Sequence, residues 1–183
     1  MLFEPIAEFL PEIRAQYAKI SHELVNVAIT ETSGPVTMQV FRMDNDQTIS
    51  HSAVGTAEVS KDSHREIPGI SLDDWMAAND PKGPILLKID IDGHEMQALR
   101  GAAKMLAHCS VIIIEVQSTA LAGIIQFIQN AGFVLFDLVE PCYYDGYFWQ
   151  ADAILIRWDV HQNYFRPFTR DTFDGDKFTL FAG

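Results

Sequence analysis

Apolar residues occur in short blocks along this chain, and the spacing within each block predicts a strand or a helix. The run 85–91 is rich in branched apolar residues, which is typical of a buried strand of a parallel sheet. Behind Gly93, apolar residues recur at helical spacing, at Met96, Leu99, Ala103 and Leu106. These two elements form a strand–helix pair, and a second such pair follows, with a strand at 111–116 and a helix at 121–128. This alternation of strands and helices predicts an α/β fold.

The N-terminal part of the chain carries weaker patterns. Apolar residues within 6–20 fall on one helical stripe, which Pro11 should kink or restart. Residues 25–30 and 36–43 predict the two strands of a hairpin. The segment 44–69 that follows is mostly polar and predicts no element.

The remaining elements surround the two strand–helix pairs. Ser71 predicts the N-cap of a short helix that leads into the strand at 85–91. Residues 133–139 and 151–158 predict two further strands. The aromatic loop 141–149 that joins them is too short for a crossover helix, so we expect an antiparallel pair.

The composition indicates one globular domain. With 183 residues and 48% hydrophobic content the chain can form a core, and we place the domain at 1–158 with a tail at 159–183. The sequence has no apolar window of membrane-spanning length, and its N-terminus lacks the features of a signal peptide, so we expect a cytoplasmic protein. The cysteines, Cys109 and Cys142, fit reduced and buried thiols better than a disulfide.

The chain is strongly acidic. Its 25 Asp and Glu residues against 13 Lys and Arg residues give a formal net charge of −12. A protein that binds nucleic acid needs a basic face to neutralise phosphates, and an anionic membrane surface makes the same demand. We therefore expect neither nucleic acid nor a membrane as a partner.

Acid and imidazole side chains follow the strand at 85–91 and surround one glycine. They are Asp90, Asp92, His94 and Glu95. In α/β sheets ligands bind beyond the carboxyl ends of strands, so these side chains are candidates for chemistry. A carboxylate at the end of a buried strand costs several kcal/mol unless it is paired. Lys88 alternates to the same face as Asp90 and is the expected partner.

Two other interpretations of this group remain open. Carboxylates and imidazole suit divalent cations, although convergence on a metal depends on the turn at Gly93. Asp92 has the position of a cap for a helix that starts near His94, and Glu95 would then lie in the first turn, where acids are favoured.

Several segments form a recognisable set of motifs. The most specific are 88–95, 99–102 and 112–115. Weaker segments occur in a matching order: Phe3-Glu4-Pro5, 26–29 with the Ser33-Gly34 turn, and 71–74. Together, over roughly residues 2 to 157, they resemble the FkbM family of S-adenosylmethionine-dependent methyltransferases.

The resemblance implies a Rossmann-like class I methyltransferase sheet, mostly parallel, with a C-terminal antiparallel hairpin. It implies S-adenosylmethionine as cofactor and O-methylation of a hydroxyl on a small molecule or a sugar. It implies no metal, because the donor already carries an electrophilic methyl group. The strands that end at Asp90 and Glu115 should be adjacent and parallel, with Asp90, Asp92 and Glu115 at one edge of the sheet.

The resemblance also implies roles for single residues. Asp90 or His94 would act as the general base, with Glu95 beside them in the catalytic group. Glu4 would accept hydrogen bonds from the ribose hydroxyls of the cofactor, with Asp90 as a second cofactor contact. Without the family pattern, Glu4 is equally well explained as favouring the N-terminus of the following helix. The implied substrate contacts are Asp92, Glu115 and Ser50.

One part of the family pattern has no counterpart in these residues. The family's glycine-rich motif lies on a first strand upstream of the Phe-Glu-Pro segment, and here only Met1, Leu2 and Phe3 precede Glu4. We expect a sheet without its first strand, weak cofactor binding, and unpaired strand edges that favour a homo-oligomer. The alternative function is a binding module, either a non-catalytic remnant or a fragment of a longer methyltransferase.

Overall fold

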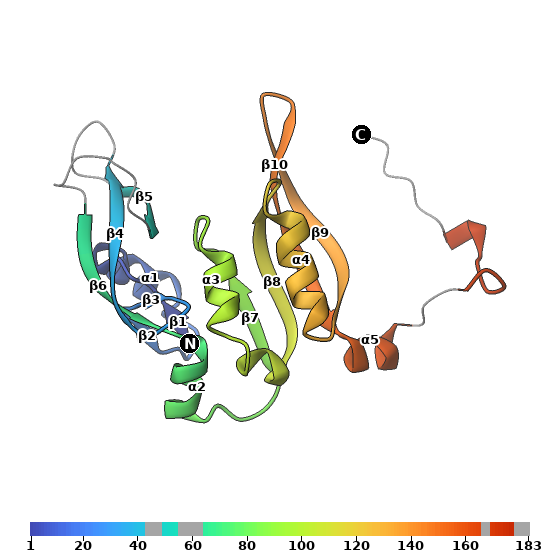
Figure 1. The fold of residues 1–183 in the computed structure, drawn as a ribbon, viewed down its shortest axis with the longest axis horizontal. Coiled ribbons are helices and arrows are strands. Elements are labelled where there is room, and N and C mark those ends of the chain that lie inside the picture. Colours follow the sequence, from blue (N-terminus) through green and yellow to red (C-terminus); the bar gives the residue numbers. More distant parts are fainter. Residues whose placement is uncertain (43–48, 55–63, 166–168, 178–183) are drawn as a thin grey trace.

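The structure, a computed structural model, describes residues 1–42, 49–54, 64–165 and 169–177. Within these residues the chain has an α/β fold whose strands form three separate sheets (Figure 1). The prediction of an α/β fold is confirmed. In the described ranges, no helix has the length and apolar character needed to cross a membrane.

The central sheet contains both predicted strand–helix pairs. Its strands are, in order across the sheet, β7 (Ile85–Ile89), β8 (Cys109–Gln117), β10 (Tyr147–Arg157) and β9 (Phe133–Tyr144). β7 and β8 are parallel, whereas β10 is antiparallel to both of its neighbours. The predicted closing hairpin is therefore confirmed.

The aromatic segment 141–149 is part of this hairpin and not a loop. β9 and β10 continue to a tight turn at Asp145 and Gly146, whose φ angles are 49° and 78°. Two successive positive φ angles are the geometry of a two-residue hairpin turn, and the Asp-Gly pair suits it. The prediction ended the first strand too early, at 139, and began the second too late, at 151, because the aromatic residues break the apolar pattern that marks a buried strand.

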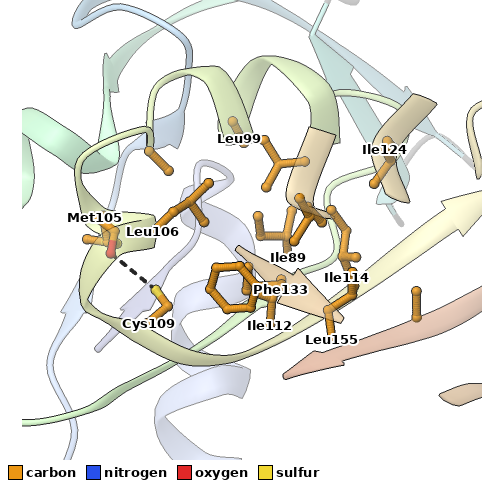
Figure 2. Packing of buried hydrophobic residues seen from close by; sticks show 14 of the residues in the cluster. Ile89, Leu99, Met105, Leu106, Cys109, Ile112, Ile114, Ile124, Phe133 and Leu155 are labelled. Atoms are coloured by element: carbon orange, nitrogen blue, oxygen red, sulfur yellow. Dashed lines mark hydrogen bonds between the residues drawn. The ribbon is translucent and has the colours of Figure 1, made fainter. Parts of the chain in front are cut away.

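Helices cover one face of the central sheet. α3 (Glu95–Arg100), the short η3 (Met105–His108) and α4 (Leu121–Asn130) pack on alternate residues of β8, because strand side chains alternate between the two faces. The largest core forms here (Figure 2). Its fully buried side chains include Leu99, Leu106, Ile112, Ile114, Ile124 and Leu155. Each contributes about 1.5–3 kcal/mol on burial, so this core stabilises the strand that carries Glu115.

The two cysteines lie in different surroundings. Cys109 is buried at the start of β8, where its thiol donates to the Met105 carbonyl at 3.4 Å (Figure 2). Burial raises the pKa of Cys109 to about 11. Cys142 is a free thiol as well, but it is exposed in β9. The prediction of a buried thiol is therefore wrong for Cys142, because β9 extends beyond the part of the sheet that the helices cover.

The N-terminal elements are short. β1 (Leu2–Phe3) and β2 (Leu24–Val25) form a parallel pair, connected through η1 (Ala7–Phe9) and α1 (Leu10–Gln16). The predicted restart at Pro11 is confirmed. Pro11 lies in the first turn of α1, where a missing N–H costs no intrahelical hydrogen bond.

A further sheet consists of β3 (Ala28–Ile29), β6 (His64–Ile70), β4 (Gly34–Arg42) and β5 (Ile49–Val54), in this order. The predicted hairpin of β4 with the strand before it is wrong, because β4 pairs with β6 and β5, while β3 pairs with β6. The polar segment 44–69 also contains two strands that were not predicted. Partner choice in sheets depends on packing between distant segments, which local periodicity does not report.

The expectation of a mostly parallel sheet is wrong for the described residues. β1–β2, β3–β6 and β7–β8 are parallel, and the remaining pairs are antiparallel. The parallel part is divided because β1 and β7 belong to different sheets. Beyond β10, the tail begins with α5 (Trp158–Tyr164) and contains η4 (Gly175–Lys177), which showed no period in the sequence.

The motif residues before β7 hold two helical segments together. Ser71 caps α2 (Leu72–Asn79), as predicted, by accepting a backbone N–H of its first turn at 3.1 Å. The Asp73 carboxylate accepts the N–H groups of Lys104 and Met105 at 2.8 to 3.0 Å. This part of the motif therefore has a structural role, which fixes α2 against the turn that follows α3.

Candidate active site

The carboxyl ends of β7 and β8 carry the predicted acid group. The register pairs Ile89 with Ile114, which places the next residues, Asp90 and Glu115, beside each other. Asp152 of β10 pairs with Glu115 on the other side. The prediction that the strands ending at Asp90 and Glu115 are adjacent and parallel is confirmed, and the charges of Asp90 and Asp92 both act on Glu115 at this edge of the sheet. We call Lys88, Asp90, Asp92, Glu115 and Asp152 the acid edge.

One lysine pairs with two of these carboxylates. Lys88 Nζ lies 3.0 Å from Asp90 Oδ2 and 3.3 Å from Asp152 Oδ2, so the predicted Lys88–Asp90 pair is confirmed. Burial lowers the pKa of Lys88, but the hydrogen bonds and charges of the two aspartates outweigh it and leave the pKa raised. Asp90 is 52% exposed because β7 is an edge strand, so its desolvation cost is smaller than the sequence suggested.

Glu115 lies among negative charges. Its Oε1 accepts a hydrogen bond from Gln150 Nε2. Burial raises the pKa of Glu115, and nearby carboxylates raise it further. These carboxylates are Asp90, Asp92, Asp152 and Glu95. The acid edge therefore has a surplus of negative charge and favours a proton or a cationic group beside Glu115.

The turn after β7 has a left-handed backbone that Glu95 stabilises. Asp92 and Gly93 have φ angles of 50° and 88°, a conformation that aspartate and glycine tolerate better than most residues. The buried side chain of Glu95 accepts the Gly93 N–H at 2.7 Å. The N-cap residue of α3 is His94, and no side chain caps it. The interpretation of Asp92 as a helix cap is therefore wrong, while the catalytic role of Glu95 stays a prediction.

His94 is half-buried at the start of α3. Burial lowers its pKa below the ordinary value of 6.5, and the charge of Glu31 acts in the opposite direction. Glu31 follows β3, and its Oε2 lies 3.7 Å from Nη1 of Arg100 in α3. The pKa of His94 thus responds to a charge in the segment after β3, whereas the pKa of Glu115 responds to the carboxylates around the acid edge.

A cleft lies between β1 and the free edge of β7. Its volume is about 370 Å³, which is within the range of small-molecule sites. Met1, Leu2 and Phe3 line one side, and residues 86–91 line the other. The resemblance places the family's first strand between the strand that ends at Glu4 and the strand that ends at Asp90, and the cleft lies between these two strands. Its lining includes Asp90, so the cleft is continuous with the acid edge.

Glu4 directly follows β1. Its Oε1 accepts the N–H of Ile6 at 2.6 Å, at the start of η1. Burial raises the pKa of Glu4, and the hydrogen bond from Ile6 lowers it. Within the described residues, Oε2 has no hydrogen-bond partner. The contact with the helical N-terminus therefore accounts for one carboxylate oxygen, and the role of Glu4 in holding the cofactor stays a prediction.

Two further expectations concern Ser50 and metal binding. Ser50 lies on β5, but its side chain is outside the described part of the structure, so its substrate contact stays a prediction. Among the residues that the structure describes, no three His, Cys, Asp or Glu side chains come together in a way that could hold a metal ion.

Gln150 and Asp152 belong to this site and were missed in the sequence. Their signal is a pair of polar residues, two positions apart, at the start of an otherwise apolar strand. The register of β10 with β9 shifts on both sides of Gln150. Such irregularities move side chains to new positions, and local patterns do not reveal them.

Replacing Glu115 by glutamine should stabilise the folded protein at neutral and higher pH. The amide keeps an oxygen for Gln150 and removes a charge that the fold disfavours. Because the pKa of Glu115 is raised from 4.5, ionisation opposes folding as the pH rises above that value. Thermal unfolding should show a more stable variant at about pH 8 and equal stability at about pH 4.

The matched control for this experiment is Glu12→Gln, which removes an exposed carboxylate from α1. This control should show no gain that depends on pH. A Glu115→Gln variant that is less stable than the natural protein at about pH 8 would contradict the charge arrangement of the acid edge.

Comparison with known proteins defines the class. Residues 1–135 match the methyltransferase FkbM domain, which is well over half of the chain. The chain therefore belongs to the FkbM methyltransferase family, and the resemblance found in its motifs is confirmed. The match ends within β9, so the aromatic end of the β9–β10 hairpin lies beyond it.

The chain is also similar to a curated protein. This relative is the hexuronic acid methyltransferase AglP of Haloferax volcanii, with 30% identity over 67 residues. The aligned part covers 37% of this chain and 28% of that protein. The chain thus matches less than a third of the relative's length.

Proposed function

We propose that this protein transfers a methyl group from S-adenosylmethionine to a hydroxyl of a small molecule or a sugar, on a Rossmann-like scaffold. One observation carries the proposal: in an FkbM family chain, the acid edge lies at the carboxyl ends of two adjacent parallel strands, beside a cleft of small-molecule size. A sugar acceptor is favoured because the relative is named a hexuronic acid methyltransferase.

The residues around the cleft fit the donor in part. Leu2, Phe3 and Leu87 give it apolar walls that suit an adenine ring. Glu4 offers a carboxylate oxygen to the ribose hydroxyls, and each charge-assisted hydrogen bond contributes about 1.5–3 kcal/mol. When bound, the donor supplies an electrophilic methyl group on a positively charged sulfonium. The surplus negative charge around Asp90 is complementary to that cation.

His94 is the better of the two candidate bases. Its lowered pKa keeps the imidazole neutral at about pH 7, so it can accept a proton from an acceptor hydroxyl. One oxygen of Asp90, by contrast, is held by Lys88. We assign Asp90 and Glu4 to the donor, and Asp92 and Glu115 to the acceptor. Glu95 is then a positioning residue, because it holds the turn that leads into His94.

A His94→Gln variant should transfer methyl groups about a hundredfold more slowly, with unchanged donor binding. The assay measures transfer of labelled methyl from S-adenosylmethionine to glucuronic acid and, in parallel, to glucose, a neutral sugar that the surplus negative charge of the acid edge does not repel. In the natural chain, the rate should fall as the pH drops through the His94 pKa, below 6.5, because only the neutral ring accepts a proton. Asp90→Asn should instead weaken donor binding.

His108→Gln is the matched control. His108 is exposed on η3, next to the first residue of β8 and so at the opposite end of that strand from Glu115. This variant should keep the natural rate. Equal rates for the His94 and His108 variants would remove the proposed base, and donor binding without any transfer would favour the binding module.

A further inference from the structure

The β9–β10 hairpin extends past the acid edge. Gln150 is the first residue of β10 that pairs with β8, and it also pairs with Cys142 of β9. Residues 143–149 therefore lie beyond the end of β8. Figure 1 shows this end of the hairpin projecting on the side where α3 begins, which is the side of the acid edge.

Aromatic rings occupy one face of this projecting end. Tyr144 lies directly opposite Tyr147, and the ring centroids of Tyr144 and Trp149 are 6.5 Å apart. These three side chains are 75%, 78% and 48% exposed, in that order. We call them the aromatic face. Tyr143 and Phe148 form a separate pair, with ring centroids 5.9 Å apart.

The backbone joins the aromatic face to the acid edge. Trp149 occupies an irregular position of β10, between residues that pair with β9, and its carbonyl accepts the Ser118 N–H at 2.7 Å. A bulge of this kind re-aims a side chain and often lies next to an active site. The following residue, Gln150, donates to Glu115. The aromatic face thus begins one residue from a contact of the proposed acceptor site.

We propose that the aromatic face binds neutral pyranose units of an oligosaccharide acceptor, a proposal that rests on the proposed function for the nature of the acceptor. Soluble proteins rarely expose contiguous apolar patches that bind nothing. Tyrosine and tryptophan offer a flat apolar surface to the C–H face of a sugar ring and a polar group to its hydroxyls.

The negative charge of the hairpin favours a neutral sugar over an anionic one. Residues 133–150 contain Asp137, Glu140 and Asp145 but no lysine or arginine. A neutral sugar unit avoids the repulsion that a carboxylated unit or an anionic membrane would meet at this surface.

Calorimetric titration of the full chain with cellotetraose tests the proposal. The glucose units of this probe have equatorial hydroxyls and so present C–H groups on both faces. We expect saturable binding at about 1 mM, weakened about tenfold in Trp149→Ala. Trp158→Ala is the matched control, because Trp158 is 47% exposed and lies directly after the far end of β10. It should bind as the natural chain does.

A second pair of variants separates loss of binding from loss of fold. Tyr144→Ser removes an exposed ring of the aromatic face, and Tyr143→Ser removes an exposed ring outside it. The proposal requires that only Tyr144→Ser weakens cellotetraose binding. Equal weakening by both would overturn it.

Other occupants are outcomes of the same experiments. Absence of saturable cellotetraose binding would overturn the proposal. Binding to phosphatidylcholine vesicles, or self-association, would also overturn it if Trp149→Ala abolished that interaction and left cellotetraose binding unchanged. Cellotetraose binding without methyl transfer would support the aromatic face and reject the proposed function. Equal transfer to an oligosaccharide by the natural chain and Trp149→Ala would support the function and reject the aromatic face.

Discussion

A Gly101→Ala variant should lose about 3 kcal/mol of its free energy of unfolding. A β-carbon at this position would lie 2.3 Å from the Thr30 carbonyl oxygen and 3.0 Å from that of Glu31. Both atoms belong to the backbone and cannot rotate away. Gly101 also accepts the Asp73 N–H at 2.8 Å, so any displacement strains the contact between α2 and the end of α3. The melting temperature should fall by roughly 6–12 °C.

The matched control for this variant is Gly123→Ala in α4. The nearest atom to a β-carbon there is Met96 Cε at 4.0 Å, which leaves room. Alanine is the better helix former, so this variant should gain up to about 1 kcal/mol. Thermal unfolding monitored by circular dichroism measures both changes. A Gly101→Ala protein as stable as the natural one would show that the segment after β3 does not pack on α3 as described.

The 183-residue chain by itself should bind S-adenosylmethionine no more tightly than about 0.1 mM. The resemblance assigns the amino-acid end of the donor to backbone amides of a glycine-rich turn. The 183 residues of this chain do not include that turn. Losing three hydrogen bonds of about 1 kcal/mol each raises a micromolar dissociation constant roughly a hundredfold. Within the part of the chain that the structure describes, β1 and β7 also have no strand partner on the edges that face the cleft, so we expect association at the concentrations that calorimetry needs.

Calorimetric titration of a monodisperse sample provides the measurement. Glu4→Gln should weaken the remaining binding further, because it removes the charge from the proposed ribose contact. Glu23→Gln is the control, since Glu23 is exposed just before β2. Micromolar binding by an isolated monomer would show that the cleft holds the donor without further backbone contacts.

The sequence predicted the part of the acid edge that lies on and directly after β7, because its signals are local. Strand periodicity placed Lys88 and Asp90 on one face, and the order of strands and helices made β7 and β8 parallel neighbours. Both predictions are confirmed by the 3.0 Å ion pair and by the register. The cap at Ser71 was predictable for the same reason, since it depends on one side chain and the helical turn beside it.

The errors concern features that depend on distant segments. Gln150 and Asp152 reach the acid edge only because irregular pairing of β10 with β9 sets their position. β4 pairs with β6 across a segment that has no apolar period, so its partner was not readable from spacing. The turn at Asp92 has positive φ angles. Aspartate and glycine tolerate such angles, but the presence of these residue types does not by itself determine the turn.

The two thiols differ in reactivity, so one cysteine of the chain can be labelled selectively. The thiolate is the reactive form of cysteine, and Cys109 is both shielded from solvent and protonated at neutral pH, because its pKa is about 11. Cys142 is exposed on the strand that carries Tyr144, two positions away. A maleimide fluorophore would therefore attach to the hairpin alone, and the natural sequence can report ligand binding at the aromatic face without an engineered cysteine.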